Sequence, residues 1–229
     1  MRQLGIFAKF WAPGRVKTRL ATTLGAEQAG QLHKVFVQTL LERLARTGDR
    51  RTIVYAPAEQ LAPFAALAGE AWNLAAQAEG DLGQRMRSWF ESAFAAGARS
   101  AVLIGSDSPT LPSAFIESAF ELLREHDVVL GPADDGGYYL VGAARPTPPV
   151  FEDMAWSKPT VWDETVARLQ AADWRYAALP RWYDVDQWED LLRLHAELAA
   201  ADASDSALAR LKRAVAQAVD ARRSAEPPQ

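Results

Sequence analysis

The chain contains no cysteine among its 229 residues. This absence excludes disulfide bonds and any metal site that depends on thiolate ligands. A chain without thiols fits a reducing compartment, and we expect a cytoplasmic protein.

Long hydrophobic runs and an excess of positive charge are also missing. No apolar stretch approaches the ~20 residues that a membrane-spanning helix needs, and the first residues show no signal-peptide pattern. The net charge is -4 at pH 7, and no Lys/Arg cluster is dense enough to follow a nucleic-acid backbone. We therefore expect no membrane span and no nucleic-acid partner.

The composition that is present is that of an ordinary globular domain. Hydrophobic residues make up 49% of the chain and charged residues 24%, close to the average for soluble domains. A length of 229 residues suits one large domain better than two small ones. We predict one domain over residues 1–223 and a flexible tail over 224–229. The oligomeric state stays open, with a homodimer as one option.

Strand and helix patterns alternate along the chain. Strands are expected at 4–9, 51–56, 72–76, 100–105, 127–131, 138–142 and 175–179. Helices are expected at 26–46, 58–68, 82–96, 112–125, 160–172, 187–200 and 206–223. This alternation predicts an α/β fold with a mostly parallel central sheet and helices on both faces. The close pair of strands around 134–137 predicts a small antiparallel excursion.

Polar residues that follow strands are candidates for a site, because ligands of open α/β sheets bind beyond the carboxyl ends of the strands. The first such cluster contains Gly14, Arg15, Lys17 and Arg19. Glycine lets a backbone come close to a ligand, and three cations at alternate positions can surround a di- or triphosphate. A solvated basic loop explains the same spacing equally well.

The second cluster is centred on Asp107, which follows the apolar run 101–104. A carboxylate at the end of a buried strand is costly to desolvate unless it is paired or binds a metal. Hard cations such as Mg²⁺ or Mn²⁺ take carboxylate oxygens as ligands. The alternative is that Asp107 caps the helix that starts near Pro112; we favour the metal.

The third cluster holds Asp184 and Asp186, which alternate in an extended segment and so point to the same side. Two like charges placed in this way repel each other unless a cation neutralises them. The alternative is that Asp186 caps the helix that begins at Gln187, with Glu189 completing a capping box.

A fourth cluster links two strands at the same edge of the sheet. Asp134, Asp135, Gly136 and Gly137, followed by Tyr138, carry a plain turn signature. Because the turn lies at the predicted ligand edge, we place substrate contacts on these five residues, and a carboxylate there is a candidate base. We assign no role to the three histidines, which are scattered and lack the spacing of metal ligands.

Six motifs together resemble a bacterial family whose members are labelled glycosyltransferases of the arsenosugar-biosynthesis type. They are FAK at 7–9, PGRVKTRL at 13–20, EGDLGQRM at 79–86, GSDSP at 105–109, GPADDGGYYL at 131–140 and DVD at 184–186. The family is similar in fold to the nucleotide-diphospho-sugar transferases of the glycosyltransferase-A type. It is related to 2-phospho-L-lactate guanylyltransferase and the molybdenum cofactor nucleotidyltransferases. The chain departs from these relatives in lacking the Gly-Gly loop of the sugar nucleotidylyltransferases.

The resemblance implies a single-domain glycosyltransferase-A-like fold and a role for each matching residue. Nucleotide phosphates would lie against Gly14, Arg15, Lys17 and Arg19, and further nucleotide contacts would come from Asp81 and Arg85. A divalent metal, Mg²⁺ or Mn²⁺, would bind Asp107 and Asp186.

These observations predict a metal-dependent transferase with a nucleotide or nucleotide-sugar donor, most directly a glycosyltransferase acting on a small-molecule acceptor. Asp107 and Lys17 would stabilise the leaving group, and Asp135 would orient the acceptor hydroxyl. One alternative is a nucleotidyltransferase of guanylyltransferase type that joins a nucleotide to a small phosphorylated acid or cofactor. The other is a nucleotide- or sugar-binding protein without catalysis.

Overall fold

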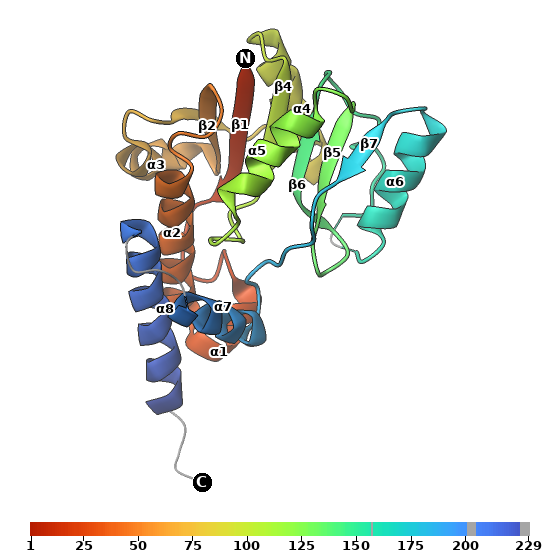
Figure 1. Cartoon of the computed structure of the whole chain (residues 1–229). Coiled ribbons are helices and arrows are strands. Elements are labelled where there is room, and N and C mark those ends of the chain that lie inside the picture. Colours follow the sequence, from red (N-terminus) through yellow and green to blue (C-terminus); the bar gives the residue numbers. More distant parts are fainter. Residues whose placement is uncertain (157, 201–204, 225–229) are drawn as a thin grey trace.

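The computed structural model describes residues 1–156, 158–200 and 205–224. Its centre is a seven-stranded sheet with the strand order β3-β2-β1-β4-β6-β5-β7 (Figure 1). The strands are β1 (Arg2–Lys9), β2 (Arg50–Ala56), β3 (Asn73–Ala76), β4 (Ser100–Ile104), β5 (Val128–Pro132), β6 (Tyr138–Ala143) and β7 (Tyr176–Ala178).

The sheet is mostly parallel, as predicted. β6 runs antiparallel to both of its neighbours, β4 and β5, whereas the other neighbouring pairs are parallel. The β5–β6 hairpin is the antiparallel excursion that the turn signature at 134–137 predicted. Because β6 runs antiparallel to β4, with Leu140 opposite Ile104, the turn before β6 lies at the edge of the sheet where β4 ends.

Two helical layers cover the two faces of the sheet. One core cluster joins β1 to α2 (Ala26–Arg43), α3 (Leu61–Ala68) and α5 (Ser113–Leu122). The other joins β4 and β5 to α4 (Leu82–Ala95) and α6 (Val161–Ala171). The side chains of a strand alternate between these layers: in β2, Ile53 and Tyr55 belong to the first cluster, and Val54 between them belongs to the second.

A third apolar cluster lies below the sheet, beyond the carboxyl ends of the parallel strands. It packs α1 (Thr18–Leu24), α7 (Trp188–Ala200) and α8 (Ser206–Ser224) against Leu32 and Phe36 of α2 (Figure 1). Val185 is buried in this cluster, and its backbone N–H donates to the carbonyl of Asp107 at 2.9 Å. The cluster therefore brings the segment before α7 to the end of β4.

Most of the predicted elements agree with the structure within a few residues, but α1 was missed. The pattern of residues 13–19 predicts a loop, whereas a seven-residue helix begins at Thr18. Ala58–Gln60 forms a short 3-10 helix before α3, and Pro112 is the N-cap of α5 instead of lying in its first turn. Ser224, predicted to start the tail, is the last residue of α8; residues 225–229 lie outside the described residues.

In the described part of the chain, none of the helices combines the length and the apolar character that a bilayer crossing requires.

Candidate functional site

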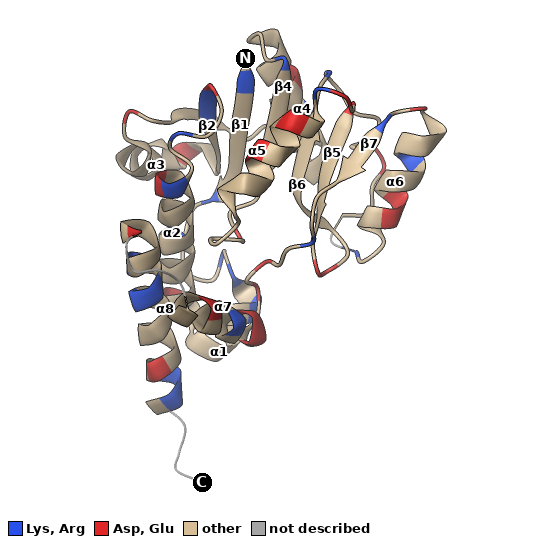
Figure 2. Cartoon of the chain, in the orientation of Figure 1, with Lys and Arg blue, Asp and Glu red and all other residues tan. Residues whose placement is uncertain are grey.

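A cavity of about 810 Å³ opens at the edge of the sheet where β1 and β4 end. Figure 2 shows that basic and acidic residues lie together in this region, between the sheet and α1 and α7. The predicted site residues that line the cavity are Arg15, Lys17, Arg19, Asp81, Arg85, Asp107, Asp135, Gly137, Tyr138 and Asp186. Gly14, Asp134 and Gly136 are the predicted site residues outside this lining.

The ammonium of Lys17 lies between the two carboxylates that were predicted as metal ligands. Lys17 Nζ is 2.9 Å from Asp186 Oδ1 and forms a second ion pair with Asp107 Oδ1. The lysine side chain is 2% exposed, whereas the side chains of Asp107 and Asp186 are 43% and 46% exposed. The two aspartates thus share one positively charged partner, and in this structure that partner is the ammonium of Lys17.

The charged forms of this group stabilise one another. Desolvation acts to lower the pKa of Lys17, but attraction to Asp107 and Asp186, with hydrogen bonds to both, leaves that pKa above its ordinary value. Desolvation acts to raise the pKa of Asp107, but Lys17 and then His33 hold it below its ordinary value. Opposite charges at hydrogen-bonding distance outweigh the cost of burial here.

The backbone before α1 directs Lys17 into this position. Lys17 is the N-cap of α1 and has φ 48° and ψ 43°, in the left-handed region that residues other than glycine seldom adopt. Its Nζ also lies 5.8 Å from the centroid of the Phe36 ring on α2. A strained backbone of this kind persists only where surrounding contacts over-determine it, and the double ion pair provides such contacts.

Neither predicted metal ligand caps a helix, so both alternative interpretations were wrong. The N-cap of α5 is Pro112, and no side chain caps that helix. Before α7, Asp190 Oδ2 accepts hydrogen bonds from the backbone N–H groups of Asp186 (3.0 Å) and Gln187 (2.8 Å). The carboxylates of Asp107 and Asp186 are therefore free to face Lys17 and the cavity.

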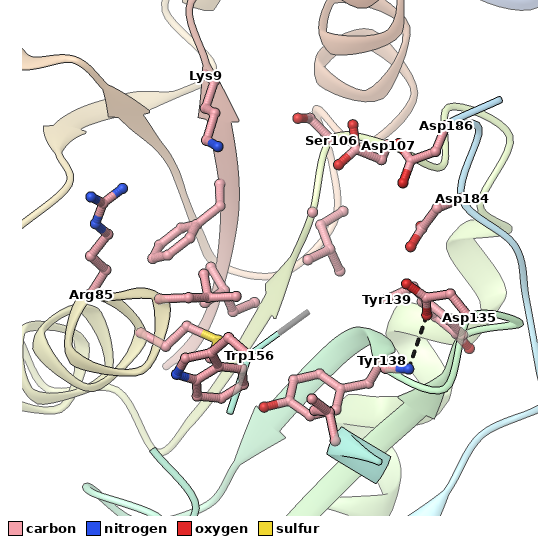
Figure 3. A pocket seen from close by; sticks show the side chains of 18 of the residues that line it. Lys9, Arg85, Ser106, Asp107, Asp135, Tyr138, Tyr139, Trp156, Asp184 and Asp186 are labelled. Carbon is pink, nitrogen blue, oxygen red and sulfur yellow. Dashed lines mark hydrogen bonds between the residues drawn. The ribbon is translucent and has the colours of Figure 1, made fainter. Parts of the chain in front are cut away.

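Asp184 adds a third carboxyl group to the same wall of the cavity (Figure 3). Ser108 Oγ lies 2.6 Å from Asp184 Oδ1. Burial, followed by the negative charge of Asp107, raises the pKa of Asp184 to about 7. The alternation at 184–186 predicts that Asp184 lies beside Asp186 but indicates no role for it, because its part-buried hydrogen bond to Ser108 depends on tertiary packing.

His33 on α2 also lines the cavity, although the scattered positions of the histidines in the sequence indicate no role for them. Its Nε2 lies 3.0 Å from the carbonyl oxygen of Lys9, which only accepts hydrogen bonds, so Nε2 carries the proton. Its Nδ1 is 3.9 Å from Asp107 Oδ1 and has no hydrogen-bond partner among the described residues. Desolvation lowers the pKa of His33. The neighbours of His33 come from other elements, so no spacing along the sequence could reveal them.

Three basic residues near the carboxylates have no ion pair in the described part of the chain. Arg15 and Arg19 are exposed and line the cavity. Lys9, at the end of β1, also points into it (Figure 3) and was missed as a site residue, although the FAK motif at 7–9 contains it. These cations can pair with a polyanionic ligand without first breaking an ion pair to any described residue.

Asp81 and Arg85 lie at the start of α4, where the fold already uses part of their hydrogen-bonding capacity. Asp81 Oδ1 accepts from the backbone N–H of Gln84, and Gln84 Oε1 accepts from the backbone N–H of Asp81, both at 2.9 Å. This pair is a capping box. Arg85 Nε donates to the carbonyl of Gly80 at 2.8 Å, and the guanidinium lies at the opposite side of the cavity from Asp184 (Figure 3).

Some of the predicted residues in the turn between β5 and β6 line the cavity, and others lie outside its lining. Asp135 Oδ1 accepts from the backbone N–H of Gly137 at 2.9 Å, which holds this carboxylate at the cavity wall. Asp134 instead forms an ion pair with Arg193 at 2.8 Å. Gly136 has φ 88° and packs against the backbone of Pro159, where a Cβ would collide.

The donor set of the cavity fits a hard divalent cation that brings further ligands with it. The side chains of Asp107 and Asp186 are about half exposed, and each has a second carboxylate oxygen without a hydrogen bond among the described residues. No group of three or more His, Asp or Glu side chains in the described ranges forms a ready metal cluster. Mg²⁺ is commonly held by one or two carboxylates together with substrate phosphates and water.

Comparison with known proteins supports the fold. A crystal structure from Desulfovibrio desulfuricans, provisionally named a nucleotide-diphospho-sugar transferase, shares 34% identity and a TM-score of 0.85, over 95% of this chain and 97% of that one. A nucleotidyl transferase from Methanothermobacter thermautotroptrophicus shares 15% identity and a TM-score of 0.59, over 86% and 97% of the two chains. At that identity the likeness concerns the fold alone.

Sequence comparison identifies relatives of this chain. A protein of Phenylobacterium zucineum named 3-phospho-D-glycerate guanylyltransferase is 34% identical over 146 residues, which are 59% of this chain and 65% of that relative. The chain thus spans less than two thirds of that relative's length. A family model described as "Uncharacterized protein conserved in bacteria (DUF2064)" matches residues 39–158, just over half of the chain. The chain belongs to the DUF2064 family, within the nucleotide-diphospho-sugar transferase fold.

Proposed function

We propose that the chain is a transferase that acts on a nucleotide donor, and that the group it transfers is a nucleotidyl group. The observation that carries the proposal is one cavity in which the Asp107–Lys17–Asp186 group adjoins Arg15 and Arg19, which form no ion pair with any residue that the structure describes. Such an arrangement suits a polyphosphate together with a divalent ion. The relative named as a guanylyltransferase supports the same reaction.

In this proposal the residues of the cavity bind and orient the reactants. Arg15 and Arg19 would pair with the donor phosphates. Asp107 and Asp186 would hold a divalent ion, which when bound supplies positive charge beside the leaving group. The acceptor would be a small phosphorylated acid, whose negative charge Lys9 would balance.

The bond changes of nucleotidyl transfer need few proton movements. An acceptor phosphate oxygen, already ionised, attacks the α-phosphorus of a nucleoside triphosphate, and the bond from that phosphorus to the β-phosphate oxygen breaks. Pyrophosphate leaves with the electron pair of that bond. Since the nucleophile carries no proton, the protein's main contributions are alignment and charge stabilisation.

Glycosyl transfer is a second candidate, and one observation favours it. Asp135 lines the cavity, and its Oδ1 is held by Gly137, which leaves Oδ2 able to accept the proton of an acceptor hydroxyl. The leaving group would then be a nucleoside diphosphate. The related D. desulfuricans structure is named for this class of donor.

A ligand screen followed by product analysis tests both candidates. Thermal shifts are recorded with nucleoside triphosphates and sugar nucleotides, with and without Mg²⁺ or Mn²⁺, because a ligand that binds only the folded state raises its stability. Release of pyrophosphate from a triphosphate supports nucleotidyl transfer, and release of a nucleoside diphosphate from a sugar nucleotide supports glycosyl transfer. Asp107→Asn should abolish turnover, whereas Asp134→Asn, outside the cavity, should not. Nucleotide binding without turnover across a broad acceptor panel would instead indicate a binding protein.

A further inference from the structure

The ammonium of Lys17 occupies the space in which Asp107 and Asp186 would hold an ion. We propose that Lys17 is an internal latch. Its ammonium occupies the carboxylate pair and hinders the binding of a free divalent cation; when a nucleotide binds, the ammonium moves to the phosphates and leaves the carboxylates available to the cation. The inference rests on the proposed function, in which a nucleotide and a cation share this cavity.

The burial of Lys17 limits how a cation can approach. The ammonium is enclosed by two carboxylates and the Phe36 ring, with 2% of the side chain exposed. Unless it displaces the ammonium, a cation entering from the cavity meets only the outer oxygens of Asp107 and Asp186, and its charge then lies next to a positive charge. Like charges at that separation repel, so a free divalent ion should bind weakly.

Lys17 is able to change partners without a change of fold. Its backbone is held at the start of α1, and Leu20 of that helix is fully buried. The ammonium, however, ends a flexible four-carbon stem. Removing it from both carboxylates with no replacement would leave an unpaired charge, which is strongly unfavourable. Phosphate oxygens would supply the replacement.

The two arginines that flank Lys17 are suited to bind phosphate next to its ammonium. Arg15 and Arg19 lie two positions on either side of Lys17, line the same cavity and have no ion pair in the described part of the chain. A polyphosphate held by them would lie beside Lys17. Cation and polyphosphate should therefore each raise the affinity of the other by the same factor, since coupling between two sites is reciprocal.

Titration with Mn²⁺, in which binding is monitored by electron paramagnetic resonance, tests the latch without any turnover. We expect Lys17→Met to bind free Mn²⁺ about tenfold more tightly than wild type, a typical size for such a coupling. Arg19→Met, which removes a charge of the same sign without touching the carboxylates, should stay close to wild type. With inorganic triphosphate added, and after correction for Mn²⁺ bound to free triphosphate, the wild type should gain more Mn²⁺ affinity than Lys17→Met. Equal or weaker Mn²⁺ binding by Lys17→Met overturns the latch.

A labelling experiment on the wild type covers the case in which Lys17→Met does not fold. In the free protein, reductive methylation read by mass spectrometry should modify Lys17 more slowly than the exposed Lys9. At Mn²⁺ concentrations that saturate the protein, the reaction of Lys17 should become several-fold faster. Continued protection of Lys17 under saturation means that the cation does not displace it, and the latch is wrong. If triphosphate and nucleotides still stabilise the protein in that case, the proposed function survives; if none of them does, the proposed function fails independently.

Discussion

Lys17 Nζ lies 2.9 Å from Asp186 Oδ1, although 169 positions separate the two residues in the chain. The contact joins the start of α1 to the segment before α7, and both regions pack into the same apolar cluster below the sheet. Any change in that packing should alter the positions of the charged side chains in the cavity. Stability and ligand binding are therefore expected to be linked in this protein.

The Lys17–Asp186 pair should make a measurable contribution to stability. We expect Asp186→Asn to lower the free energy of unfolding by about 1–2 kcal/mol, because a buried ammonium loses one of two charged partners while Asp186 itself is half exposed. Urea denaturation in a chelating buffer measures this loss. The matched control is Asp134→Asn, which breaks an exposed pair with Arg193 and should cost less than ~0.5 kcal/mol. Equal losses in the two variants would contradict the expectation.

Asp184 should make stability depend on pH near neutrality. Its pKa of about 7 in the folded protein exceeds the ordinary aspartate value of ~3.9, so folding favours the protonated form. Its stabilising contribution is complete below the unfolded pKa and is lost as the pH rises through about 7. Without metal, wild type should lose on the order of 2 kcal/mol relative to Asp184→Asn between pH 5 and pH 8. Parallel stability curves for the two proteins would show that Asp184 is not perturbed.

Asp190 should support Asp186 through the backbone. Asp190→Ala removes the acceptor of two backbone N–H groups, and we expect a loss of about 1 kcal/mol, the usual value for a helix cap. Because one of those N–H groups belongs to Asp186, affinity for Mn²⁺ in the presence of triphosphate should also fall. Glu189→Ala, at an exposed position of the same turn, is the control and should preserve both quantities. A variant Asp190→Ala with wild-type affinity for Mn²⁺ would restrict Asp190 to a purely structural role.

Arg15 and Arg19 should govern nucleotide affinity. We expect Arg15→Met and Arg19→Met each to weaken nucleotide binding about tenfold, as for the loss of one charge-assisted hydrogen bond. The defect should shrink at high salt, because exposed charges are screened. Isothermal titration at two ionic strengths measures both effects, with Arg193→Met outside the cavity as the control. Undiminished binding in both cavity variants would contradict the proposal that Arg15 and Arg19 pair with the donor phosphates.

The architecture was largely predictable because it depends on local patterns. Apolar runs such as 101–104 and the turn at 134–137 predicted the buried β4 and the antiparallel β5–β6 pair. α1 was not predictable in the same way. It has only seven residues, and its single buried residue, Leu20, packs against α2, α7 and α8, so the helix depends on contacts with distant segments.

The sequence by itself determined that the sheet is mostly parallel and that carboxylates and cations follow its strands, because periodicity and strand ends are properties of neighbouring residues. The tertiary structure alone decided that Lys17 lies between Asp107 and Asp186, that Asp190 holds the backbone before α7 and that His33 faces Asp107. Those relationships depend on how helices pack below the sheet. A side chain's burial and charge environment come from residues far away in the chain, and no spacing along the sequence records them.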